Sequence, residues 1–111
     1  MMRKHEVING HKISVWDCPK FIDRYMVVYL DDVFKHPAHH NAEYVNYLAM
    51  NSYPFHPQGF CQHGEIPIDS VQYKGRGGCF DKRIKFADLP ADCQKAVLQD
   101  LEIDEREAQN G

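Results

Sequence analysis

Four side chains of types that bind zinc fall within ten residues of one another. They are His56, Cys61, His63 and Glu65, and their spacing is H-x4-C-x-H-x-E. Imidazole, thiolate and carboxylate groups are all ligands that zinc accepts. Residues two positions apart can share a metal ion only where the backbone is extended or looped, which the glycines of this segment allow. A zinc site, structural or hydrolytic, is therefore one hypothesis, with Glu65 as the local candidate for the base that a hydrolase needs.

The same segment also fits an ordered polar loop that contacts a partner. In this interpretation Phe55 and Phe60 anchor the loop on the core, and its polar groups cap backbone amides. This interpretation is the favoured one, so no cofactor is predicted and zinc stays an alternative. A second histidine cluster, residues 36–40, has no Asp, Glu or Cys between its histidines and is the weaker candidate for a native metal site. The predicted contact residues of the loop are Phe55, His56, Gln58, Phe60 and His63.

Residues 73–85 carry five basic side chains and one acidic side chain, interleaved with aromatic rings. Arginine and lysine neutralise phosphates, and exposed rings stack on bases. The glycines here lack the order of a phosphate-binding loop. The segment is therefore interpreted as a nucleic-acid contact, a protein-partner surface or a solvated loop and strand. Its candidate contact residues are Arg76, Lys82, Arg83 and Lys85.

The four cysteines include no C-x-x-C pair, which excludes the usual zinc-ribbon and thioredoxin patterns. Residues 1–6 carry charge but no apolar run typical of a signal peptide, so we expect a cytoplasmic chain with reduced thiols. Cys93 falls on the apolar face of a predicted helix and is interpreted as a buried small side chain rather than a nucleophile. No serine stands in a G-x-S-x-G frame. These patterns favour a binding domain over an enzyme. The cysteines are Cys18, Cys61, Cys79 and Cys93.

Length and composition fit one compact domain. The chain has 111 residues, of which 43% are apolar and 26% are charged. No run approaches the ~18 consecutive apolar residues of a membrane span. The net charge is −3, and acidic side chains gather at the C-terminal end. We predict a single domain over residues 1–103 and a short, acidic, frayed tail over residues 104–111.

An antiparallel sheet is expected to position these groups. Asn9-Gly10 stands between two β-prone runs, residues 6–8 and 11–16. This pair predicts a hairpin with a type I′ turn, because both central residues of that turn need a positive φ. Residues 25–30 are continuously apolar and predict a central strand buried on both faces, which ends at the two aspartates that follow.

The rest of the chain alternates between irregular segments and short elements. Residues 31–42 are predicted as a loop, and residues 43–50 as a strand in preference to a helix. Residues 51–69 are predicted as a long irregular segment, of a kind that is often functional. Residues 82–86 predict a strand, and a helix follows from Asp88, which is expected to cap it. The side chains expected on the buried face of this helix are Cys93, Val97, Leu98 and Leu101.

The expected fold is therefore α+β. It is an antiparallel sheet of four to five strands that opens with the Asn-Gly hairpin and carries a C-terminal helix packed on one face. Three stretches, Asp23–Val28, Met50–Phe60 and Lys82–Pro90, resemble a group of small uncharacterised proteins carried by bacteriophages and bacterial mobile elements. The similarity runs over residues 22–101. It implies a phage or mobile-element context in the bacterial host cytoplasm and carries over no catalytic residue.

These observations together predict a small phage or mobile-element accessory protein that acts by binding a macromolecule of the host or the phage. Counter-defence is one such role. A protein is the favoured partner, nucleic acid bound through residues 73–85 is an alternative, and metal binding by the 56–65 segment is another. No membrane contact is predicted, and the oligomeric state is left open.

Overall fold

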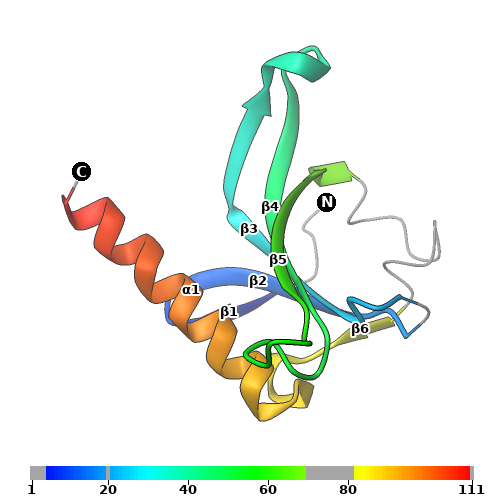
Figure 1. The fold of residues 1–111 in the computed structure, drawn as a ribbon. Coiled ribbons are helices and arrows are strands. Elements are labelled where there is room, and N and C mark those ends of the chain that lie inside the picture. The colour runs from blue at the N-terminus through cyan, green and yellow to red at the C-terminus, as the bar shows by residue number, and fades with distance from the viewer. Residues whose placement is uncertain (1–4, 20, 70–81, 111) are drawn as a thin grey trace.

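The protein is one antiparallel sheet with a long helix across one of its faces (Figure 1). The computed structural model describes residues 5–19, 21–69 and 82–110, the last eight of them by their backbone alone. Within these ranges the sheet has six strands, and the order β1-β2-β3-β4-β5 follows the chain, while β6 pairs with β2. The predicted α+β fold is confirmed. The strands are β1 (Glu6–Ile8), β2 (His11–Asp17), β3 (Tyr25–His36), β4 (Ala42–Met50), β5 (Cys61–Pro67) and β6 (Lys82–Ile84).

Two short strands share one edge of β2. β1 pairs with residues 11–13 of β2, and β6 pairs with residues 15–17. The turn that joins β1 to β2 has Asn9 at φ 52° and Gly10 at φ 83°, as the predicted hairpin requires. The strand predicted over residues 82–86 is confirmed as β6, although it is shorter than expected.

The β3–β4 hairpin is longer than the sequence indicated. The predicted loop over residues 31–42 is confirmed only for residues 37–41 and is wrong at both ends, because β3 continues to His36 and β4 begins at Ala42. The two aspartates interrupt the pairing rather than end the strand: the register shifts between Tyr29 and Phe34. The strand predicted over residues 43–50 is confirmed. The end of this hairpin reaches beyond the rest of the sheet and forms the upper arm in Figure 1.

The predicted C-terminal helix is confirmed in outline. The helix α1 spans Ala91–Asn110 and packs on the sheet through Cys93, Val97 and Leu101. Leu98 was expected on this face but is 37% exposed, and Ala96 is buried instead. A second apolar cluster, which includes Trp16 and Met26, lies on the other face of the sheet. No helix within the described ranges combines the length and apolar character needed to cross a membrane.

Asp88 does not cap α1. Its carboxylate oxygen Oδ2 accepts a hydrogen bond from the backbone N–H of Lys85 at 3.0 Å, and so it caps the short 3-10 turn Phe86–Asp88 that precedes the helix. The reason is local geometry: two residues separate Asp88 from the first residue of α1, so Asp88 does not occupy the position directly before the helix, while the Lys85 N–H is within reach of its side chain. The frayed tail predicted over residues 104–111 stays a prediction.

Candidate functional site

A basic cavity opens at the edge of the sheet where β2 and β6 pair. Its volume is about 580 Å³. Four cationic side chains line it against two carboxylates, so its described lining carries a net charge of +2 in a chain whose total is −3. We refer to it as the basic pocket. Its described lining residues are Asp17, Arg24, Tyr25, Lys82, Arg83, Ile84, Lys85 and Asp88.

Both carboxylates of the basic pocket are already engaged. Asp17 accepts two hydrogen bonds from the Arg24 guanidinium, at 2.7 Å from Nε and 3.0 Å from Nη2. The hydrogen bond and the charge of Asp17 raise the pKa of Arg24 above its usual value. Asp88 is held by the Lys85 N–H. Lys82 and Lys85 line the same cavity, and both are exposed residues.

Arg83 is less exposed than Lys82 and Lys85. Its Nε atom is buried, and the described part of the chain offers it no hydrogen-bond partner. An atom without exposed surface is closed to a ligand in the cavity, so this nitrogen does not by itself mark a binding site. The uneven charge of the lining is the feature that indicates an anionic ligand.

The loop between β4 and β5, residues 51–60, is closed by hydrogen bonds of its own. Asn51 Oδ1 accepts from the backbone N–H groups of Tyr53 at 2.9 Å and Phe60 at 3.0 Å. His56 Nδ1 accepts from the N–H of Gln58 at 3.1 Å. The prediction that polar groups of this loop cap backbone amides is therefore confirmed.

Glycine is required at position 59 of this loop. A Cβ atom there would lie 1.6 Å from the carbonyl oxygen of Tyr53, which no backbone can accommodate without moving. The predicted anchoring role of Phe55 is wrong, since its side chain is 50% exposed, whereas Phe60 is only partly exposed. The same loop contains a small cavity of about 280 Å³. Its lining residues are Tyr53, His56, Gln58 and Gly59.

The remaining candidates of this segment lie on a strand. The long irregular segment predicted over residues 51–69 is wrong beyond residue 60, because Cys61, His63 and Glu65 belong to β5 and lie on one face of it. Their partners differ. His63 Nε2 lies 2.9 Å from Asp100 Oδ1 on α1, and Glu65 Oε2 lies 3.3 Å from His36 Nε2 on β3.

This arrangement bears on the zinc hypothesis. His56 lies in the loop, while the other three candidates, Cys61, His63 and Glu65, follow one another along β5. Within residues 5–19, 21–69 and 82–110, no group of three or more His, Cys, Asp or Glu side chains is arranged to hold a metal ion. Zinc binding stays a prediction.

Two cysteines have raised pKa values, which works against a nucleophilic role at neutral pH. Burial raises the pKa of Cys93 to about 11, with smaller contributions from Asp92 and Cys61. Burial and then the charge of Asp100 raise the pKa of Cys61. Cys93 has no exposed surface, so its predicted burial is confirmed.

Sequence reasoning missed the contacts that join distant parts of the chain. Tyr29 donates its hydroxyl hydrogen to Asp100 Oδ2 at 2.5 Å, so one carboxylate links β3, β5 and α1 through Tyr29 and His63. No local signal marks Asp100, which stands among other acids. Arg24 pairs with Asp17 because the register of β2 and β3 places Asp17 opposite Tyr25, the next residue, and this register is known only from the structure.

The structure thus divides the predicted contact residues among three places. Lys82, Arg83 and Lys85 come together in the basic pocket, and Arg76 lies outside the described residues. His56 and Gln58 lie together in the 51–60 loop, and His63 lies apart on β5. Searches of protein-family models, curated proteins and solved structures found no match to this chain.

Proposed function

We propose that this chain is a non-enzymatic binding protein that holds the phosphate backbone of a nucleic acid in the basic pocket. The observation that carries the proposal is the gathering of Lys82, Arg83 and Lys85 around one cavity whose described lining has a net charge of +2. Phosphate oxygens are strong acceptors for guanidinium and ammonium groups.

The charge distribution supports an anionic partner. The pocket concentrates cations in a chain that is acidic overall, which favours an anionic ligand at this place on the surface. Nucleic acid is the favoured partner over a protein, because it presents phosphates at regular intervals along a strand. An accessory role in a phage or mobile-element context is compatible with this binding and stays part of the proposal.

Charge reversal at the pocket tests the proposal. Lys82 and Lys85 have exposed side chains, so Lys82→Glu with Lys85→Glu changes the charge without opening the core. Binding of a fluorescein-labelled oligonucleotide, followed by fluorescence anisotropy at low salt, is expected to be lost in this double variant. Lys35→Glu is the control for charge reversal away from the pocket, because Lys35 is an exposed lysine of the β3–β4 arm; it is compared with each single pocket variant, Lys82→Glu and Lys85→Glu, as well as with the double variant.

Two outcomes contradict the proposal. One is wild-type protein that binds no oligonucleotide. The other is a double variant that binds as well as the control variant. Affinity capture of a host protein that survives nuclease treatment, and that the double variant loses, would instead favour a protein partner for the same pocket.

A further inference from the structure

Two exposed aromatic rings stand on the 51–60 loop. Tyr53 is 64% exposed and Phe55 is 50% exposed. The loop that carries them is fixed by the Asn51 side chain, by the turn bond from the N–H of Gly59 to the carbonyl oxygen of His56 at 2.8 Å, and by the close approach at Gly59. Rings that are already ordered lose little conformational freedom when a ligand covers them.

The 51–60 loop and the basic pocket lie at the same end of the sheet. The strand register aligns Lys82, Asp17, Tyr25, Met50 and Cys61 in one row across that end. Strands are about 4.8 Å apart, so β6 and β4 are separated by roughly 15 Å. Figure 1 shows the loop beside the first turns of α1, at the end of the molecule where β6 lies.

Polar groups accompany the rings. His56 Nδ1 accepts the Gln58 N–H, so a neutral His56 carries its proton on Nε2 and can donate it. The Gln58 side chain lines the same small cavity and offers both a donor and an acceptor. An aromatic surface with an adjacent donor and acceptor suits the face and the edge of an unpaired base.

We propose that the ligand is single-stranded nucleic acid, whose bases stack on Tyr53 and Phe55 while its phosphates occupy the basic pocket. This inference rests on the proposed function and adds the class of nucleic acid to it. A single strand can present unstacked bases, whereas the bases of a duplex are stacked and paired and cannot reach the rings. Exposed rings alone would also suit a protein partner, and it is the cationic pocket at the same end of the sheet that favours a strand of nucleic acid.

The test compares one sequence as single strand and as duplex. Fluorescein-labelled DNA of roughly 16 nucleotides covers the range of site sizes known for small single-strand binders. Wild-type protein is expected to bind the single strand more tightly than the duplex. Tyr53→Ala with Phe55→Ala is expected to weaken single-strand binding about 5-fold or more, from the loss of base stacking, and to leave duplex binding unchanged.

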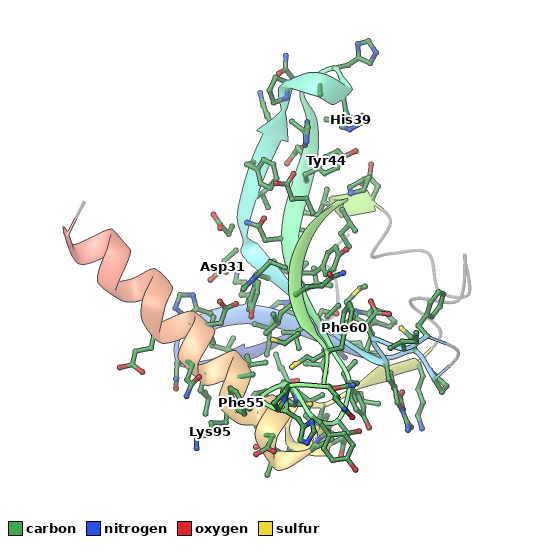
Figure 2. All side chains as sticks on the ribbon, viewed as in Figure 1. Asp31, His39, Tyr44, Phe55, Phe60 and Lys95 are labelled. Carbon is green, nitrogen blue, oxygen red and sulfur yellow. The ribbon has the colours of Figure 1, made fainter. Side chains whose placement is uncertain are left out.

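Two further variants separate the loop from general surface effects. Phe55→Tyr keeps an aromatic ring and is expected to bind as wild type does. Val33→Ala is the control for the loss of an exposed apolar side chain elsewhere, and it is expected to bind as wild type does. Val33 is 40% exposed on β3, within the arm. Figure 2 places the tip of this arm, marked by His39, at the end of the molecule opposite Phe55. Circular dichroism of each variant confirms that it is folded.

The outcomes distinguish the two proposals. Equal affinity for single strand and duplex, with no effect of the Tyr53→Ala and Phe55→Ala changes, overturns the stacking inference and leaves the pocket standing. Absence of binding to either oligonucleotide overturns the proposed function itself. If, in that case, the aromatic variant loses a protein captured from nuclease-treated lysate, the loop docks a protein and both proposals are wrong.

Discussion

Burial determines the chemistry of the Cys93 thiol, because it raises the pKa of this group. Its thiol lies at zero exposure on α1, with Sγ 3.1 Å from the carbonyl oxygen of Asn51, to which it donates. The pKa rises from 9.0 to about 11 on folding. An unfolded chain therefore loses this proton at a lower pH than the folded chain does.

The consequence is a loss of stability at alkaline pH. A group whose pKa is raised on folding contributes stability that is present below pH 9 and is lost as the pH rises toward 11. We expect the free energy of unfolding, measured by urea denaturation, to fall more steeply over this range in wild type than in Cys93→Ala. Parallel curves for the two proteins would show that Cys93 does not titrate in this way.

Tyr29 is the second residue whose role depends on a distant partner. Its ring belongs to the core and its hydroxyl donates to Asp100, 71 positions away. A hydrogen bond to a charged group contributes about 1.5–3 kcal/mol, and we expect Tyr29→Phe to lower the free energy of unfolding by that amount. Tyr53→Phe is the control, because Tyr53 is largely exposed and its change is expected within about 0.5 kcal/mol of wild type. Equal effects of the two substitutions would contradict the role of Asp100.

At the scale of elements, the 51–60 loop and β5 each contain a glycine with a different neighbour. A Cβ atom at Gly59 would meet backbone, the carbonyl oxygen of Tyr53, whereas one at Gly64 would meet the far end of the Tyr47 ring at 2.3 Å. A ring can rotate away more cheaply than a closed loop can move. We expect Gly59→Ala to lower the urea midpoint more than Gly64→Ala does, and to weaken single-strand binding as well.

The test is which of the two glycine substitutions lowers the urea midpoint more. A larger loss from Gly64→Ala would mean that the loop adapts and that its order is not needed. Unchanged oligonucleotide binding in a folded Gly59→Ala protein would separate the closed form of the loop from its proposed role.

β5 also sets the expectation for zinc. Two of the four candidate ligands, His63 and Glu65, have partners on α1 and β3, and His56 lies in the loop. We therefore expect untagged protein, purified without chelators or nickel resin, to hold far less than one zinc per chain by mass spectrometry of its metals. About one zinc per chain would make this segment a coordination site and would require His56 and β5 to be arranged differently.

The elements that sequence predicted well are those set by neighbouring residues. Asn9-Gly10 fixes its own turn, and residues 25–29 of the apolar run 25–30 are buried in the sheet. Asp31 and Asp32 were misleading because their partners come from other elements: Asp31 lies 3.3 Å from His11 Nδ1, and Asp32 accepts from Asn46 at 3.3 Å. Local rules cannot supply such partners.

The candidate site residues show the same difference between features set by neighbouring residues and features set by distant ones. Lys82, Arg83 and Lys85 were recognisable as a group because they are neighbours in the chain, and they line one cavity. β5 was missed because Gly64 and Pro67 are typical of loops, although an edge strand tolerates both. The Tyr47 ring occupies the space that a side chain at position 64 would fill. The ring lies there because β4 pairs with β5, which places Tyr47 opposite Gly64.

For the molecule as a whole, the balance of charge predicts how binding depends on salt. The net charge is −3, and the cations not committed to a carboxylate of the pocket are Lys82, Arg83 and Lys85. Each phosphate contact to a single strand contributes about −0.7 to the slope of log affinity against log salt. Three contacts, one from each of these residues, give a slope of about −2.

Neutralising one cation should change that slope by a defined step. We expect Lys85→Gln to reduce its magnitude by about 0.7, and Lys35→Gln, on the arm, to leave it unchanged. Tyr53→Ala is expected to lower affinity by the same factor at every salt concentration, because stacking releases no counterions. Anisotropy titrations from low to physiological salt measure the slope for wild type and for each of the three variants. A wild-type slope near zero, or an equal change in slope for Lys85→Gln and Lys35→Gln, would show that phosphates do not bind in the basic pocket.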